Sequence, residues 1–188
     1  FLLPPAGNVS EKTAEEVFTA LMKGTRPEPE KAETWRTTTL VFLARLYAEK
    51  GWAMQLHIGA LRHANSRGME TIGPNSGFDA MDDQPVISPL ARLLDILETR
   101  TTLPKTILFS ANPAHDDALA VLAATFQDGS VPGKMQHGPA WWFNDHAAGI
   151  SKHLVSLSAN GLLSRFIGMT TDSRSILSFS RHDYFRRI

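Results

Sequence analysis

Residues 103–113, LPKTILFSANP, join an apolar segment to the start of a helix, and this junction indicates the fold class. Lys105 to Ser110 is short and mostly apolar, as expected of a strand that is covered on both faces. Asn112-Pro113 then begins a helix, because asparagine caps free N–H groups and proline is tolerated in the first helical turn. The segment therefore predicts a buried strand that leads directly into a helix, which is the repeating step of an α/β fold.

The same alternation extends in both directions from this junction. Helices are expected at residues 11–22 (opened by a Thr13-x-x-Glu16 capping box), 35–50, 88–100, 112–127, from Asp145 to about Gly161, and from about Ser180. Strands are expected at residues 52–58, 105–110, 134–137 and 165–171. Because a helical segment separates each strand from the next, we predict parallel strands joined by right-handed crossovers. A doubly wound sheet and a segment of a barrel both give this pattern, although no G-x-G-x-x-G follows a strand.

The stretch between Arg62 and Gln84 is polar and rich in glycine. A loop of this length inside a compact domain is usually functional or disordered. Within it, GPNSGFD (Gly73 to Asp79) suits either an anion-binding nest or a plain turn, and we favour an ordering role over a chemical one.

Composition narrows the classes of function. The 188 residues carry 19 basic and 19 acidic side chains, a balance that gives no reason to expect nucleic acid or a membrane surface as a partner. The absence of cysteine excludes disulfides and cysteine-based zinc sites and fits the cytoplasm. The chain starts without methionine and stops at Phe185–Ile188 without a helix stop signal, so we expect it to be a piece of a longer protein.

Polar residues follow each expected strand, at the end where parallel α/β folds bind their ligands. His57 and Arg62 come with the first strand, and Asn112 and His115 with the second. The third is followed by His137, Trp141, Trp142, Asn144 and Asp145, and the fourth by Asp172, Ser173 and Arg174. Imidazole, guanidinium, indole and carboxylate groups together suit a site for an anionic, hydroxylated ligand.

Each prominent residue also has an ordinary structural interpretation. Asp172 suits a metal ligand or a proton carrier, but equally a helix N-cap. Arg174 suits a bidentate contact with a carboxylate or a surface salt bridge, and His57 suits a ligand, an acid or a base, or a buried histidine bonded to the backbone. Trp141 and Trp142 suit either the wall of a sugar site or core packing. No HxH or HExxH pair is present, so the chain has no self-contained metal motif.

Six strings carry a resemblance to a known family. They are MQLHIGALR, GPNSGFD, LPKTIL, WWFND, GMTTDSRS and RHDYFRRI. In this order and with similar gaps, they resemble the uronate (glucuronate) isomerase family, a branch of the amidohydrolase-like barrels. The resemblance implies that residues 35–188 are the C-terminal part of a (β/α)8 TIM barrel, about four βα units and roughly strands 5–8. Residues 1–34 match nothing recognisable and are expected to be an N-terminal helical lead-in.

The resemblance also implies an activity. Family members interconvert D-glucuronate with D-fructuronate and D-galacturonate with D-tagaturonate, an aldose–ketose isomerisation through an enediol. A divalent metal, usually zinc, is held by an HxH pair on the first strand and an aspartate on the eighth. On this basis Asp172 is the metal ligand and a catalytic residue, and His57 is the fifth-strand histidine with a catalytic role. Arg174 and Arg62 would bind substrate, as would the tryptophan of WWFND, placed at Trp142 with Trp141 as the fallback.

Some features depart from the family pattern. Arg62-His63-Ala64-Asn65 replaces Arg-Asn-Asn-Asn, GPNSGFD replaces GPDTGFD, and His137 and Pro139-Ala140 replace Phe and Ser-Gly, changes that bear on substrate preference. The HxH strand is absent, so we expect the chain to be inactive alone and to pair with the missing N-terminal half, in a cytoplasmic homo-oligomer. The alternatives are a non-catalytic fragment or assembly module, and a metal-dependent amidohydrolase-type hydrolase, against which the DSR and WWFND strings argue.

Overall fold

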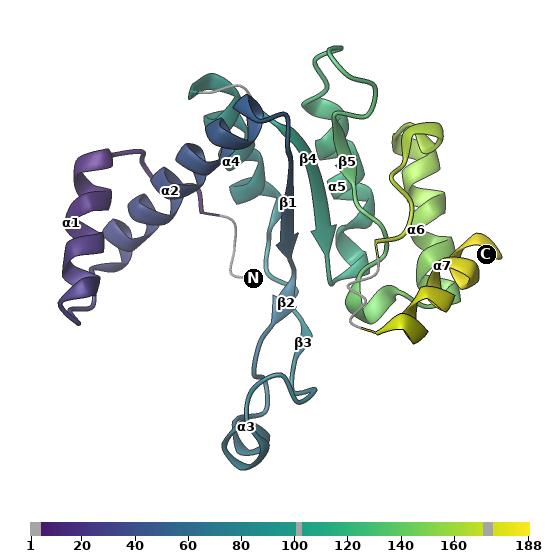
Figure 1. Cartoon of the computed structure of the whole chain (residues 1–188), viewed down its shortest axis with the longest axis horizontal. Helices are drawn as coiled ribbons and strands as arrows, with labels where there is room; N and C mark the ends of the chain where they lie inside the picture. Colours follow the sequence, from purple (N-terminus) through teal and green to yellow (C-terminus); the bar gives the residue numbers. More distant parts are fainter. Residues whose placement is uncertain (1–4, 101–102, 171–174) are drawn as a thin grey trace. The chain divides into compact units, whose positions relative to one another are not determined.

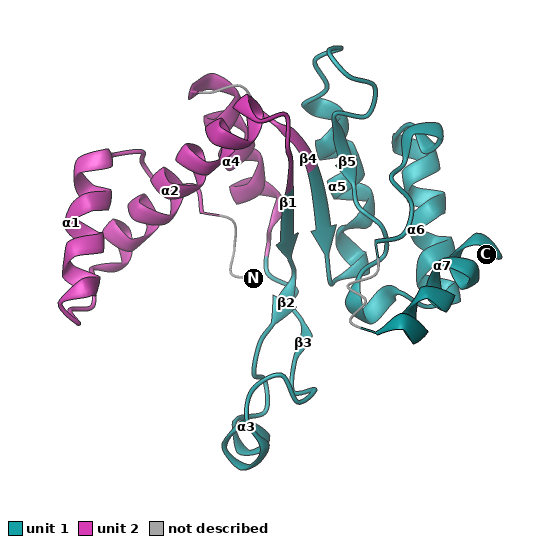
Figure 2. Ribbon diagram, viewed as in Figure 1, with its two compact units in different colours: residues 1–2, 55–84, 107–188 teal, residues 3–54, 85–106 magenta. Residues whose placement is uncertain are grey.

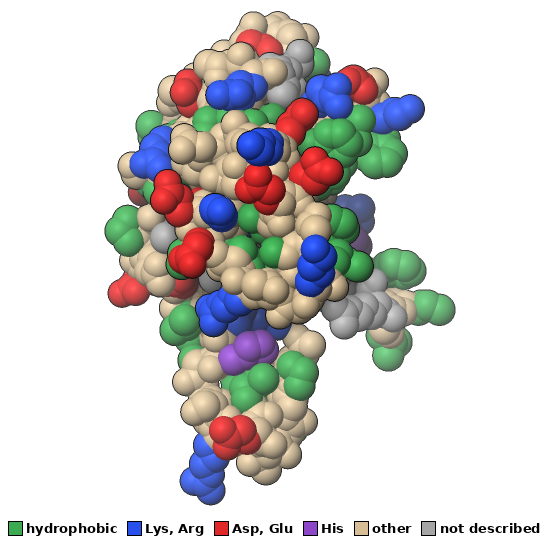
Figure 3. Space-filling view, turned by 90° about the vertical axis from the view of Figure 1, so that its left-hand side faces the viewer, with side chains coloured by type: hydrophobic (Ala, Val, Ile, Leu, Met, Phe, Trp, Pro, Cys, Tyr) green, Lys and Arg blue, Asp and Glu red, His purple; other side chains and the backbone are tan. Residues whose placement is uncertain are grey.

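The computed structural model describes residues 5–100, 103–170 and 175–188, which form two compact units (Figure 2). Unit 1 contains Gln55–Gln84 and Ile107–Ile188, and unit 2 contains the residues up to Met54 together with Pro85–Thr106. In the described part of the chain, no helix is long and apolar enough to cross a membrane. On the face shown in Figure 3, basic and acidic side chains are interspersed rather than gathered into patches of one sign.

The described part of unit 2 contains three helices, α1 (Glu11–Met22), α2 (Pro29–Glu49) and α4 (Ile87–Arg100). The leucines of α4 recur at helical spacing, and Leu90, Leu93, Leu94 and Leu97 are all fully buried. The predicted capping box at Thr13 is wrong, because the N-cap is Ser10, whose hydroxyl accepts the Thr13 N–H at 3.2 Å. The second helix begins six residues earlier than predicted, because Pro29 suits its first turn.

Unit 1 contains the parallel sheet. The strand order in this sheet is β1 (Ala53–Ile58), β4 (Lys105–Ser110) and β5 (Met135–His137) (Figure 1). The unit includes all of β5 and the carboxyl-terminal parts of β1 and β4. After β4 come η1 (Pro113–His115) and α5 (Asp116–Thr125), and after β5 come η2 (Trp142–Asn144) and α6 (Ala147–Asn160). The predicted α/β class with parallel strands is therefore confirmed.

The fourth predicted strand, at residues 165–171, is not observed over its described residues. The 3-10 turn η3 (Leu163–Arg165) is followed by irregular chain to Thr170, while Thr171 lies outside the described residues. The amide of Gln136 on β5 donates to the Arg165 carbonyl at 2.9 Å and accepts the Ile167 N–H at 3.2 Å. A side chain thus takes up backbone groups that a strand would pair with its neighbour, so no ladder forms. The chain ends in η4 (Ile176–Phe179) and α7 (Ser180–Arg186).

The glycine-rich stretch after β1 is more ordered than predicted. It begins with β2 (Ala60–Leu61), which pairs antiparallel with β3 (Ala80–Met81), and the two strands enclose α3 (Ser66–Ile72). Asn65 caps α3 by accepting the Gly68 N–H at 3.0 Å. The stretch is therefore a hairpin with a short helical tip, which extends from the carboxyl end of β1 (Figure 1).

Candidate functional site

His57 lies near the carboxyl end of β1, between two aromatic rings. Its imidazole stacks on Phe109 of β4 with ring centroids 4.5 Å apart and an interplanar angle of 4°. Trp141 meets the same imidazole edge-on, with centroids 4.7 Å apart. Adjacent parallel strands place residues of equal depth side by side, which explains why the histidine and the phenylalanine meet. The half-buried His57 ring therefore has a fixed orientation beside the first tryptophan of WWFND.

Trp142 continues this aromatic series toward Arg62. The Trp141 and Trp142 centroids lie 5.7 Å apart, and Trp142 also stacks on Phe143 with centroids 4.7 Å apart. The guanidinium carbon of Arg62 lies 5.4 Å from the Trp142 ring centroid, which is a cation–π geometry. His57, Trp141, Trp142 and Arg62 thus form one series of contacts, called here the His57–Arg62 cluster.

The turn that presents the tryptophans is held from two sides. Asn144 is buried, and its amide donates to the Ala111 carbonyl at 2.8 Å, which ties the turn to the end of β4. Asp145 makes an ion pair with Arg181 of α7. The sequence strings WWFND and RHDYFRRI are therefore in contact.

The hairpin side of the cluster is held by two residues of GPNSGFD. Arg62 donates to the Asn75 side-chain oxygen at 2.7 Å and lies 3.4 Å from the Asp79 carboxylate. Asp79 also accepts the His63 N–H at 2.9 Å, and its side chain is only 5% exposed. The sequence predicts an ordering role for this string but singles out neither residue.

Backbone strain is concentrated at the same place. Among the described residues, the non-glycine positions with positive φ are His63 (59°), Asn75 (62°) and Trp142 (46°). Such a conformation costs about 1–3 kcal/mol at an ordinary residue, and tryptophan adopts it less readily than asparagine or histidine. All three lie in segments that form or flank the His57–Arg62 cluster, and such a concentration is typical of functional sites.

The polar residues after β4 have structural roles. Ser110 Oγ lies 3.0 Å from His115 Nδ1 and accepts the Asn112 N–H at 3.0 Å. The Asn112 amide donates to the Asp82 carbonyl at 2.9 Å. Burial lowers the pKa of His115, and the nearby Asp82 carboxylate partly opposes this shift. These groups fix the carboxyl end of β4 against the hairpin.

A second group of titratable residues is buried between β5 and the helices α5 and α6. His137 and His153 are each 2% exposed, their ring centroids are 4.5 Å apart, and His137 Nε2 lies 3.5 Å from Asp116. Burial lowers the pKa of His137 to about 3, with a smaller contribution from the nearby His153. Burial also lowers the pKa of His153 to about 4. Burial also raises the pKa of Asp116 to about 6, which Lys152 opposes and Asp117 reinforces. Nothing in the sequence pattern pairs these residues, since they come from three separate elements.

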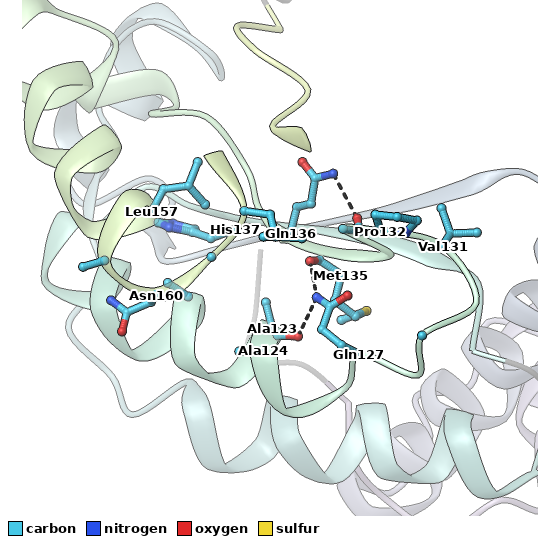
Figure 4. A pocket seen from close by; sticks show the side chains of 16 residues that line it. Ala123, Ala124, Gln127, Val131, Pro132, Met135, Gln136, His137, Leu157 and Asn160 are labelled. Carbon is cyan, nitrogen blue, oxygen red and sulfur yellow. Dashed lines mark hydrogen bonds between the residues drawn. The ribbon is translucent and has the colours of Figure 1, made fainter. Parts of the chain in front are cut away.

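His137 also lines a cavity of about 510 Å³ between α5, β5 and α6 (Figure 4). Most of the cavity wall is apolar, including Ala123, Ala124 and Leu157. Gln127 closes one side by donating to the carbonyls of Ala123 and Met135 at 3.1 and 2.7 Å. None of the four predicted site residues that the structure describes lines this cavity, so it is separate from the His57–Arg62 cluster.

The structure brings together four of the six residues predicted for the site, namely His57, Arg62, Trp141 and Trp142. The other two, Asp172 and Arg174, lie outside the described residues. Within residues 5–100, 103–170 and 175–188, no group of three or more His, Asp or Glu side chains could hold a metal ion. The roles assigned to all six residues stay predictions.

Known proteins are similar to this chain in sequence and in fold. Uronate isomerases of Bacillus pumilus and Bacillus subtilis are both 49% identical to the chain, over 179 and 182 residues. Each alignment covers 95% of this chain but 37% and 38% of the relative, so the chain spans less than two fifths of their length. The crystal structure of uronate isomerase from Thermotoga maritima, at 31% identity, matches 98% of this chain and 40% of its own with a TM-score of 0.86.

The family model described as glucuronate isomerase matches residues 4–188. This match begins well before Trp35, which is where the resemblance based on the six strings begins. The predicted domain division at residue 34 stays a prediction. Together with the relatives above, the family match shows that the chain belongs to the glucuronate isomerase family.

Proposed function

We propose that the chain supplies part of the active site of a uronate isomerase. Its substrates would be D-glucuronate, converted to D-fructuronate, and D-galacturonate, converted to D-tagaturonate. The observation that carries the proposal is the His57–Arg62 cluster, which continues from β1 through two tryptophans to a guanidinium. It combines a titratable imidazole, flat apolar ring faces and a permanent positive charge, which suit a sugar that bears a carboxylate.

The proposed setting is a (β/α)8 barrel in which residues 35–188 form roughly strands 5–8. The order β1-β4-β5 supports this, since consecutive strands of such a barrel are neighbours. Residues 165–167 are attached to Gln136 on β5, where the next barrel strand would lie. The N-terminal half of a longer protein would supply the other strands, and the assembled enzyme is proposed to be a cytoplasmic homo-oligomer.

Each predicted site residue has a proposed role in the reaction. Isomerisation moves a proton from C2 to C1 through an enediol, while O1 gains a proton and O2 loses one. His57 and Asp172 would transfer these protons as general acid and base. Arg62 and Arg174 would bind the negative charge of the substrate or the enediolate. Trp142, with Trp141 behind it, would cover an apolar face of the sugar.

A divalent metal, zinc, is part of the proposal, with Asp172 as one ligand. When bound, it would polarise the carbonyl oxygen of the open-chain sugar. The described residues do not fit a metal by themselves, because they include no group of three or more candidate ligands close enough to hold one. The remaining ligands would come from outside this chain, and the roles above use only the side chains of the chain itself.

The test is isomerisation of D-glucuronate, with added zinc or manganese, by this chain alone and by the chain mixed with the N-terminal remainder of the Bacillus subtilis relative. Activity should appear only in the mixture and should be lost in Asp172→Asn and His57→Asn. The matched control is Asp183→Asn, which changes an exposed carboxylate on α7 and should leave activity unchanged.

Other results would point elsewhere. Activity of the chain alone would contradict the proposal that its site is incomplete. An inactive mixture whose two parts associate would favour a non-catalytic fragment or assembly module. Hydrolysis of an amide or ester in place of isomerisation would favour an amidohydrolase-type hydrolase.

A further inference from the structure

Asp79 lies one residue before β3, next to the pair that Leu61 and Ala80 form between β2 and β3. The register pairs Leu61 with Ala80, so one step further along the hairpin Arg62 faces Asp79. The Asp79 carboxylate accepts the His63 N–H at 2.9 Å and lies 3.4 Å from the Arg62 guanidinium. At 5% exposure this carboxylate is shielded from water, so its ion pair is screened less than a surface pair.

Arg62 is held from three directions at once. Asp79 contacts one terminal nitrogen, Asn75 accepts from the other at 2.7 Å, and the guanidinium lies over the Trp142 ring. A flexible arginine side chain loses considerable rotamer entropy when it is fixed in one place. Contacts that fix it before the substrate arrives remove that cost from binding.

We infer that Asp79 is a positioning residue that acts through Arg62, assisted by Asn75, and keeps the guanidinium over Trp142 ready for an anionic substrate. The inference rests on the proposed function for its consequence in catalysis, but the placement of Arg62 can be tested without it. Asp79 itself would not touch the substrate, because its carboxylate faces Arg62 and His63 and would repel a uronate.

The first experiment measures the Arg62 Nε–H chemical shift by NMR in the whole 188-residue chain. A proton over an indole face is shifted upfield, so Arg62 should differ from the exposed Arg26, in the segment between α1 and α2. Asp79→Asn keeps an oxygen that can accept the His63 N–H but removes the charge, and Asn75→Gly removes the amide while tolerating the positive φ. Both variants should move the Arg62 signal toward that of Arg26, and Asp183→Asn, which breaks the exposed Asp183–Arg187 pair, should not.

The second experiment measures isomerisation of D-glucuronate by the chain mixed with the N-terminal remainder of the Bacillus subtilis relative. Asp79→Asn should raise KM about tenfold while kcat changes by less than about threefold. An unchanged Arg62 shift in Asp79→Asn would overturn the inference, as would an unchanged or lowered KM. An inactive wild-type mixture would count against the proposed function alone, since the NMR result still decides whether Asp79 holds Arg62.

Discussion

Lowering the pH from 7 to 5 should destabilise the folded chain, because two histidines are buried in a form that resists protonation. The His137 and His153 rings lie 4.5 Å apart, and each side chain is 2% exposed. Burial lowers the pKa of His137 to about 3 and that of His153 to about 4, whereas both would return to about 6.5 in the unfolded chain. Protons therefore bind to the unfolded chain first as the pH falls.

The size of the effect follows from these pKa values. A histidine whose pKa is lowered in the folded state contributes its full stability at pH values above its pKa in the unfolded chain. This stability is lost as the pH falls below that value, about 6.5. At pH 5 the loss is about 2 kcal/mol for each histidine. Asp116 acts in the opposite direction, because its pKa is raised to about 6 in the folded chain, and it restores about 1 kcal/mol. The net loss between pH 7 and pH 5 is about 2–3 kcal/mol.

The assay is urea unfolding at pH 7 and pH 5, followed by tryptophan fluorescence. His137→Phe removes one of the two histidines and should reduce the loss between these pH values by about 2 kcal/mol. His182→Phe, on α7, should leave the loss unchanged. Equal unfolding free energies of the wild-type chain at both pH values, or a His137→Phe variant as acid-sensitive as wild type, would show that the buried histidines do not cause the acid sensitivity.

Three further substitutions test the packing on which the site depends, each by the urea midpoint and the slope of unfolding at pH 7. Gly59→Ala should destabilise the chain by about 1–3 kcal/mol, because the added methyl would lie 2.6 Å from Ser110 Oγ at a φ of +78°, and wild-type stability would contradict this. Leu93→Ala should cost about 2–5 kcal/mol through a cavity in unit 2, and a cost below 1 kcal/mol would show that the helices repack. Asn144→Ala should cost about 1–3 kcal/mol by leaving the Ala111 carbonyl unpaired, unless that carbonyl finds a new partner.

The parts of the fold that sequence reasoning predicted are those with a strong local signal. The strand at residues 105–110 is found with the predicted bounds, because its apolar run is bounded by Pro104 and by the Asn112-Pro113 helix start. Residues 165–171 have a similar composition, yet the described part is irregular. A strand requires its backbone groups to pair with a neighbouring backbone, and apolar composition cannot show that a side chain, here Gln136, binds those groups instead.

The site was predicted in part. The rule that parallel strands carry ligands at their carboxyl ends predicted His57 and Trp141 at the same end of the sheet, and the structure shows the two rings in contact. Asn75 and Asp79 were missed because their role depends on the register of a hairpin within a stretch that was read as loop. The pair of His137 and His153 was missed because it joins a strand to a helix without any shared sequence pattern.

The most direct test of the central claim is a ¹H NMR spectrum of D-glucuronate in D₂O with zinc, the chain and the N-terminal remainder of the Bacillus subtilis relative. We expect D-fructuronate signals, deuterium at C1 of the product, and the loss of both when His57 is changed to Asn. The base that takes the proton from C2 can exchange it with the solvent before it returns a proton to C1, which is why deuterium should enter the product. D-glucuronate that stays unchanged and undeuterated, although the two polypeptides associate, would contradict the claim that this chain carries part of a uronate isomerase site.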